Sequence, residues 1–441
     1  MALRKEPQRR YASVGQFAAD IRRYLDGLPV IAHKDTFSYR TSKFVRRHRM
    51  GVVAAALVLV SLVGGILSTM RQAHRAERRF NDVRSLADSL LFEIIPKFYT
   101  VPGTAEAQEI ATRRALQYLD TLSQEGGNDL KLKRELAIAY RAVADHMDDS
   151  MTNYPRLVET RQKIIDFEEK LAKSEPSDLH AQDELARDYE RFAWTLWRNG
   201  DDAKGLEFYN KALAVRKALL TADNESFDFN YRLGHVEMSI GDLFSNGNKP
   251  REALQHYRTA LSSLEKLRQH KDEPANRLRL QRALAYAHNG MAAALSRAND
   301  LEAASAEYAR GWALIEPMMS NLTNDLVACE LVTRNYLGQA KVDSKRADYQ
   351  NARTKLRHAI EILETLPQSE TQTRVTLADA YTDLGAVLYQ SGDAAHAAEY
   401  LQKAIHIQEE LSQSAGSRQL QNALATSYDL LAAARRKLTE R

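Results

Sequence analysis

The sequence predicts an all-α protein in which a long solenoid of helix pairs makes up most of the chain. Only 19 Gly and 10 Pro occur among the 441 residues, whereas a β-sandwich or barrel needs a turn signal about every ten residues. Good helix formers such as Ala, Leu, Glu and Arg dominate instead. A leucine followed by small residues and, in most units, an aromatic recurs with 46 to 51 residues between successive starts. The seven starts are Leu136, Leu185, Leu233, Leu284, Leu331, Leu377 and Leu424.

Each of these helices leads through a polar turn into a second helix that carries small residues around a Tyr or Leu. Small residues let paired helices approach closely, and the larger side chain fills the space behind them. The pattern resembles tetratricopeptide repeats, although the units exceed the usual length of about 34 residues and most lack a closing proline. The resemblance implies an α-solenoid over residues 130–441. The best-fitting residues are Gly385, Gly392, Asp393, Ala397 and Ala404.

Residues 71–129 are expected to cap the first turn of this solenoid. Apolar residues recur at helical spacing over 71–97, and again over 104–125. The ends of a solenoid need capping because each repeat otherwise leaves an apolar face uncovered. A parallel homodimer through the 71–97 helix is the alternative use of the same face.

The charge distribution divides the N-terminal part of the chain. Residues 1–49 hold twelve Lys or Arg against four Asp or Glu, and residues 50–70 hold no charge. As a helix, 50–70 would span about 30 Å, which predicts a single transmembrane helix. Residues 34–49 form a basic juxtamembrane linker, which favours a cytoplasmic N-terminus and an extracytoplasmic repeat domain. Arg46, Arg47 and Arg49 are expected to hold anionic lipid headgroups rather than nucleic acid.

Residues 1–33 resemble the last two helices of bacterial serine/threonine protein kinases. The resemblance rests on Pro7-Gln-Arg-Arg10-Tyr11 and on the following run from Phe17 to Gly27. In that family the arginine that matches Arg10 pairs with a glutamate of the activation segment. The sequence contains no Gly-rich loop, His-Arg-Asp catalytic loop or Asp-Phe-Gly motif, so we expect no kinase activity from it. The resemblance implies the non-catalytic remainder of a kinase-type receptor.

No constellation of residues predicts catalysis, a metal or a cofactor. The one cysteine, Cys329, excludes a multi-cysteine zinc site. The twelve histidines are scattered without paired carboxylates at ligand spacing. We therefore expect no enzyme activity and no cofactor.

Binding is the function that the repeat pattern favours, because solenoids expose a concave face lined by their first helices. Large aromatic residues beside arginine are typical of binding hot spots. The repeat offsets place the expected partner-binding residues on that face: Trp194, Trp197, Arg198, Asp242, Asn246, Asn289, Arg297, Lys341 and Lys345. One hypothesis is a membrane-anchored sensor or interaction module that binds a protein or peptide. The other is a non-signalling, membrane-tethered scaffold with cytoplasmic repeats.

Overall fold

The computed structural model describes residues 11–32, 36–47, 49–54, 57–65, 70, 105–125, 130–150, 153–269, 274–367, 371–414 and 418–439. The chain divides into two units, Met1–Leu86 and Ala87–Arg441. Throughout the described residues the regular elements are helices, which confirms the all-α prediction.

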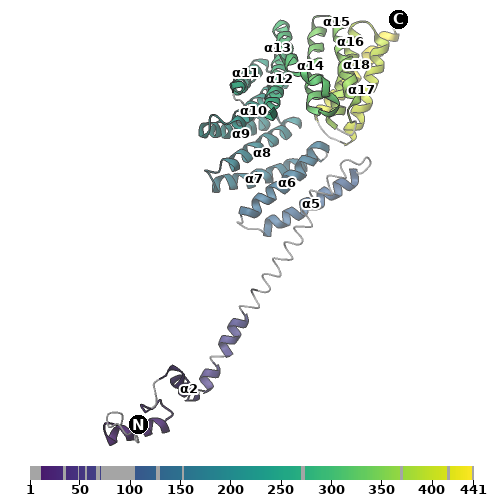
Figure 1. Ribbon diagram of the computed structural model, residues 1–441. Coiled ribbons are helices and arrows are strands. Elements are labelled where there is room, and N and C mark those ends of the chain that lie inside the picture. Colours follow the sequence, from purple (N-terminus) through teal and green to yellow (C-terminus); the bar gives the residue numbers. More distant parts are fainter. Residues whose placement is uncertain are drawn as a thin grey trace. The chain divides into compact units, whose positions relative to one another are not determined.

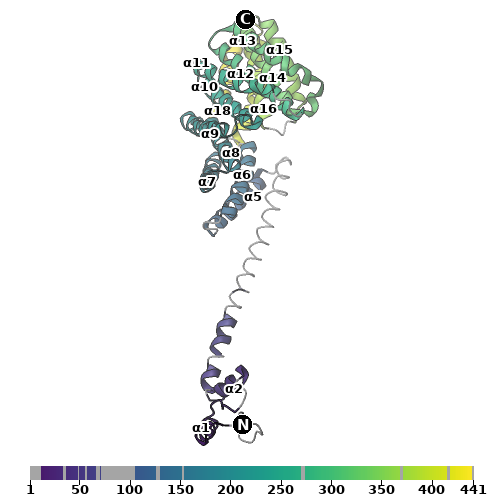
Figure 2. The same ribbon diagram turned by 60° about the vertical axis from the view of Figure 1, so that its left-hand side comes forward.

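The second unit is a solenoid of antiparallel helix pairs (Figures 1 and 2). Its described part contains an initial helix, six pairs and a final helix. The initial helix is α5 (Ala105–Glu125). The first helices of the pairs are α6 (Leu130–Ser150), α8 (Leu179–Arg198), α10 (Phe227–Asn246), α12 (Pro274–Arg297), α14 (Leu326–Lys345) and α16 (Thr371–Gln390). The second helices are α7 (Tyr154–Ser174), α9 (Asp202–Ala222), α11 (Pro250–Lys266), α13 (Leu301–Ile315), α15 (Tyr349–Thr365) and α17 (Ala394–Ser414), and α18 (Arg418–Thr439) ends the array.

Polar residues at the turns fix where many of these helices begin. Asp201, for example, accepts a hydrogen bond from the backbone N–H of Lys204 and thereby satisfies one of the free donors of α9. Before it, Gly200 adopts a φ of +84°, a left-handed conformation that glycine reaches without steric cost. The same capping by a side-chain oxygen occurs at Asp178, Ser226, Asp300, Asp325 and Asp348.

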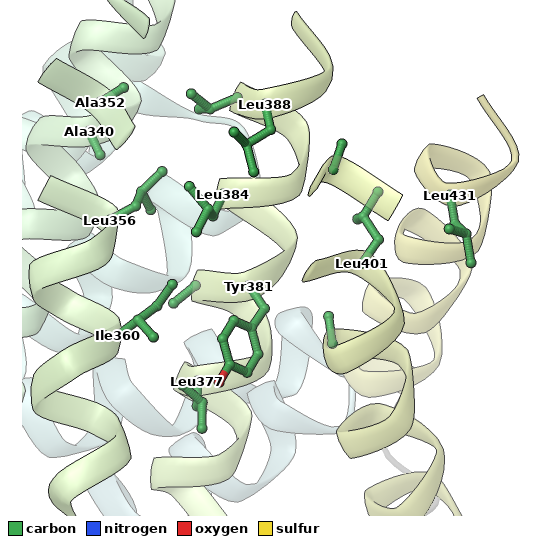
Figure 3. Packing of buried hydrophobic residues seen from close by; sticks show 14 of the residues in the cluster. Ala340, Ala352, Leu356, Ile360, Leu377, Tyr381, Leu384, Leu388, Leu401 and Leu431 are labelled. Carbon is green, nitrogen blue, oxygen red and sulfur yellow. The ribbon is translucent and has the colours of Figure 1, made fainter. Parts of the chain in front are cut away.

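Aromatic or leucine side chains of the second helices are inserted between neighbouring first helices. Tyr257 of α11 is 1% exposed and lies against Gly241 of α10 and Gly290 of α12. Leu401 of α17 packs against Gly385 in the same manner. Figure 3 shows this C-terminal core, in which Leu356 and Leu384 also lie. The close approach that the sequence predicted from its small residues is therefore present.

The first helices line the concave side of the array. Neighbouring first helices contact one another from α8 to α18, and α6 additionally contacts α16. An array whose early and late first helices meet is curved toward those helices. We call the surface formed by α8, α10, α12, α14 and α16 on this side the concave face.

Buried ion pairs, which the sequence did not predict, hold the first helix pairs together. Arg161 of α7 is 1% exposed and bonds to Asp145 at 2.7 Å and to Asp148 at 2.5 Å. Arg141 of α6 bonds to Glu168 at 2.9 Å, and its other partners are Glu184 and Asp188. Arg216 of α9 pairs with Asp183 and Glu190. The Asp148 carboxylate is 7% exposed and is therefore a buried, ion-paired group.

Glu168 is expected to make stability depend on pH. Burial raises its pKa from 4.5 to about 7, and Asp188 acts in the same direction while Arg141 opposes both. Because this pKa is higher in the folded than in the unfolded chain, its contribution to stability is complete below about pH 4.5 and is lost as pH rises to about 7. Urea unfolding should show a Glu168-dependent loss of up to about 3 kcal/mol across this range. Glu168→Gln should remove this loss, and an unchanged pH profile in the variant would contradict the assignment.

Among the described residues of the first unit, the short helices α1 (Val14–Leu25) and α2 (Phe37–Arg47) precede the helical stretches 49–54 and 57–65. Ser13 caps α1 by accepting a hydrogen bond from the backbone N–H of Gln16. Asp20 is buried and accepts three hydrogen bonds, from the Tyr11 hydroxyl at 2.6 Å and from the backbone N–H groups of Ile31 and Ala32. These bonds fold residues 11–32 around the carboxylate. Arg10 lies outside the described residues.

The prediction of a transmembrane helix over 50–70 is wrong for the part of the segment that is described. A span needs about 20 consecutive apolar residues in one helix. Here the described helical stretches are 49–54 and 57–65, and among the described residues no helix is both long and apolar enough to span a membrane. The predicted single-pass membrane localisation, with a cytoplasmic N-terminus and an extracytoplasmic repeat domain, depended on that helix and is therefore wrong as well.

Candidate functional site: the concave face

At the N-terminal end of the concave face, α8 presents a stacked aromatic and cationic pair. The Arg198 guanidinium carbon lies 4.3 Å from the ring centroid of Trp194. Both Trp194 and Trp197 are half-buried and pack against the core between α8, α9 and α10. A Cβ on Gly205 would lie 3.3 Å from the Cβ of Trp197, so Trp197 contributes to helix packing more closely than Trp194 does.

In the middle of the concave face, Asp242 is hydrogen-bonded to two tyrosines from different helices. Its two carboxylate oxygens accept hydrogen bonds from the hydroxyls of Tyr257 and Tyr286, each at 2.5 Å. Burial, followed by the Asp242 charge, raises the pKa of Tyr257 well above its ordinary value, so the phenol remains a donor. The guanidinium of Arg334 stacks on the ring of Tyr286, with its central carbon 4.4 Å from the ring centroid.

Three of the predicted binding residues make bonds between neighbouring repeats at the C-terminal ends of the first helices. Arg297 donates to the Ser245 hydroxyl at 2.6 Å and to the Asn246 side-chain oxygen at 3.0 Å. Lys345 donates to the backbone oxygen of Ser296 at 2.5 Å. Cations at this position satisfy free acceptors at the end of the preceding helix.

Asn289 is 1% exposed and belongs to a buried hydrogen-bond network instead of the surface. The Asn335 amide donates to the Asn289 side-chain oxygen at 2.7 Å and to the backbone oxygen of Tyr308 at 3.0 Å. Gln339 continues the network by donating to Asn335 at 2.6 Å. The helical spacing placed Asn289 near the concave face, but its side chain lies between α12, α13 and α14.

Toward the C-terminal end, Lys341 of α14 forms an ion pair of 3.1 Å with Asp383 of α16. Lys341 keeps 60% of its side chain exposed although it lies among charged groups of two helices. Asp379 lies one helical turn before Asp383. Burial and the Asp383 charge raise its pKa to about 6, and Lys341 opposes this shift.

Four further residues lie on the concave face that the sequence did not single out: Arg232, His235, Arg279 and Arg334. Burial, followed by the charges of Arg279, Arg232 and Arg216, lowers the pKa of His235 to about 4, although the residue is exposed to solvent. Charged residues at helical spacing, Asp228 and Arg232 on α10 and Arg279 and Arg282 on α12, were the available signal, but such spacing does not distinguish the concave face from any solvated helix face.

The other predicted sites lie outside the concave face. Arg46 and Arg49 line a shallow pocket with Phe37 and Val45 in the first unit, and their assignment to lipid headgroups, together with that of Arg47, stays a prediction. The 71–97 segment proposed for dimerisation lies outside the described residues. Within the described part of the chain, no three His, Cys, Asp or Glu are placed to hold a metal ion. Cys329 is buried and donates its thiol to the Leu322 backbone oxygen at 2.9 Å.

Comparison with known proteins finds a match between residues 377–414 and the tetratricopeptide repeat family. No curated protein matches the chain. Among solved structures, BtubC from P. vanneervenii is 17% identical with a TM-score of 0.44. The alignment covers 59% of this chain and 93% of the BtubC chain. A tetratricopeptide repeat protein from Parabacteroides merdae is 14% identical with a TM-score of 0.38. The alignment covers 78% of this chain and 99% of that protein's chain.

A third structure, aspartyl phosphate phosphatase F from Bacillus subtilis, is 14% identical with a TM-score of 0.40, and the alignment covers 79% of this chain and 84% of that one. At these identities the likeness concerns the fold alone. The family match covers most of α16 and all of α17. Residues 377–414 are therefore a tetratricopeptide repeat, and the other helix pairs of the array share its helix–turn–helix arrangement.

Proposed function

We propose that the repeat array binds an extended segment of a protein partner along its concave face. Tetratricopeptide repeats are protein interaction modules, and the observation that carries the proposal is a series of stacked pairs on the first helices. Arg198 on Trp194, Arg279 on Tyr231 and Arg334 on Tyr286 each place a guanidinium over an aromatic ring. Rigid aromatic and guanidinium groups in partly desolvated positions are typical of interface hot spots.

The finer hypothesis, an interaction or sensor module of a kinase-type receptor, rests only on the resemblance of residues 1–33. Its alternative is an assembly scaffold without a signalling role. Both use the same concave face. Reading the genomic sequence upstream of Met1 distinguishes them, since an in-frame kinase core would support the receptor and its absence would favour the scaffold.

Trp194→Ala is expected to weaken partner binding by tenfold or more while the array stays folded. Trp194 is half-buried and stacks with Arg198 at the N-terminal end of the concave face. Truncating an aromatic anchor typically costs about 1–2 kcal/mol or more of binding free energy. The whole chain is used to select binders from a displayed library of random peptides about 16 residues long. Their affinities for the variant are then measured by fluorescence anisotropy.

Trp312→Ala is the matched control, because Trp312 is half-buried on the second helix α13. It should leave peptide affinity unchanged at a temperature where circular dichroism shows both variants folded. Selected peptides whose affinity is insensitive to Trp194→Ala and to Arg334→Ala would overturn binding at the concave face.

A further inference from the structure

Arginines and the carboxylates of α16 occupy different parts of the concave face along the array. On α10, α12 and α14, Arg232, Arg279 and Arg334 keep 35%, 40% and 39% of their side chains exposed. Each has a carboxylate neighbour: Asp183 at 3.6 Å, Asp228 at 3.0 Å and Glu330 at 3.6 Å, respectively. The two longer separations are beyond hydrogen-bond distance. The guanidinium groups of Arg232 and Arg334 therefore retain donors that those carboxylates do not occupy.

Two of these arginines are held in the same way. The Arg279 guanidinium carbon lies 4.5 Å from the Tyr231 ring centroid, and the Arg334 guanidinium carbon lies 4.4 Å from the Tyr286 ring centroid. In both cases the tyrosine belongs to one first helix and the arginine to the next. Stacking fixes the plane of the guanidinium. The terminal nitrogens of Arg279 already donate to Asn276 at 3.1 Å and to Asp228 at 3.0 Å, whereas the edge of Arg334 can bind a planar carboxylate through two hydrogen bonds. Burial is the main cause of the low pKa of His235, and the positive charges of Arg279, Arg232 and Arg216 act in the same direction.

On the concave face, α16 presents carboxylates, whereas α10, α12 and α14 present arginines. Helix α16 contains three charged residues, Arg374, Asp379 and Asp383. Arg374 pairs with Glu410 of α17, on the side away from the concave face. Asp383 shares the ion pair with Lys341, whereas the pKa of exposed Asp379 is raised by burial and then by the Asp383 carboxylate one turn away. A cation from outside the chain would relieve this repulsion.

We propose that the concave face recognises an extended protein segment of mixed charge, in which acidic side chains meet α10, α12 and α14 and a lysine or arginine meets Asp379 and Asp383. This inference rests on the proposed function and adds the chemistry of the partner. The acidic side chains bind the Arg232 and Arg334 guanidiniums, whose donors the neighbouring carboxylates do not occupy. The basic side chain binds the α16 carboxylates, so the two charge groups fix the direction in which the segment lies across the repeats.

The peptide selection described above tests this inference through the sequences it yields. Enriched peptides should carry an acidic group and a basic residue separated by several residues. For these peptides, Arg334→Ala and Asp379→Asn should each lower affinity by about tenfold, and added salt should lower it further. Arg258→Ala on α11 and Asp202→Asn on α9 are the matched controls on second helices and should leave affinity unchanged.

Reversing the charge on both the array and the peptide distinguishes a direct contact from an indirect effect of the mutation. Arg334→Glu should abolish binding of a selected acidic peptide, and replacing the acidic residues of that peptide by lysine should restore it. Absence of recovery in a variant with the wild-type circular dichroism spectrum would overturn the contact. Enriched peptides that lose affinity in Trp194→Ala but carry no such charges would overturn the mixed-charge inference and leave the proposed function intact.

Discussion

Arg161→Ala is expected to lower the free energy of unfolding by about 3–5 kcal/mol. The Arg161 side chain is 1% exposed, and its bond to Asp148 joins α7 to a carboxylate of α6 that is itself only 7% exposed. Removing the guanidinium leaves that charge buried without its ionic partner, and the adjacent Thr195 hydroxyl, at 3.4 Å, is a weak substitute. Urea unfolding followed by circular dichroism measures the loss.

The loss should be concentrated in the first helix pairs. In a solenoid each repeat contacts mainly its neighbours, so a defect between α6 and α7 destabilises that end more than α14 to α18. Hydrogen exchange should therefore quicken first in α6, α7 and α8. Exchange that quickened equally over all helices would contradict this local effect.

A double variant, Arg161→Met with Asp148→Leu, supplies the control. Replacing a buried ion pair by apolar side chains of similar volume is often neutral or stabilising. The double variant should be clearly more stable than Arg161→Ala, because Asp145 is 43% exposed and can be hydrated by itself. Equal losses in both variants would assign the effect to side-chain packing instead of an unpaired charge.

Gly290→Ala is expected to destabilise the centre of the array by about 2 kcal/mol. An added Cβ would lie 2.6 Å from the Cζ of Tyr257 and 2.8 Å from its hydroxyl. The ring cannot move away easily, because Gly241 lies close to it and its hydroxyl is bonded to Asp242. Overpacking of this kind costs about 1–3 kcal/mol or more, which exceeds the gain of about 1 kcal/mol from replacing a helical glycine by alanine.

The leucines of later helix pairs suggest how the strain can be relieved. Leu356 and Leu401 occupy in α15 and α17 the position that Tyr257 occupies in α11, and both are buried. In a double-mutant cycle, Gly290→Ala should therefore cost less in a Tyr257→Leu background than in the native one. Gly51→Ala, with nothing within 4 Å of its added Cβ, should change stability little. A cost independent of residue 257 would contradict the steric explanation.

Much of the solenoid could be predicted because its determinants are local or periodic. Turn residues such as Gly200 and Asp201 specify where helices end and begin, and small residues spaced like Gly241 and Ala253 mark where helices meet. The error at 50–70 arose from the same local reasoning. Absence of charge indicates that a segment is apolar, whereas among the described residues no helix is both long and apolar enough to span a membrane.

The sequence by itself determined the all-α class, the succession of helix pairs and the helix faces that become buried. Only the tertiary structure decided which charged residues are buried, which bond between repeats and which remain on the concave face. Arg161 and Arg334 are equally polar in sequence, yet one is enclosed between α6 and α7 and the other stacks on Tyr286 with 39% of its side chain exposed. The physical reason is that helical periodicity fixes the direction of a side chain relative to its own helix. The partners of a charge come from other helices, such as Asp148 of α6 for Arg161 and Tyr286 of α12 for Arg334, and their positions depend on how the helices pack.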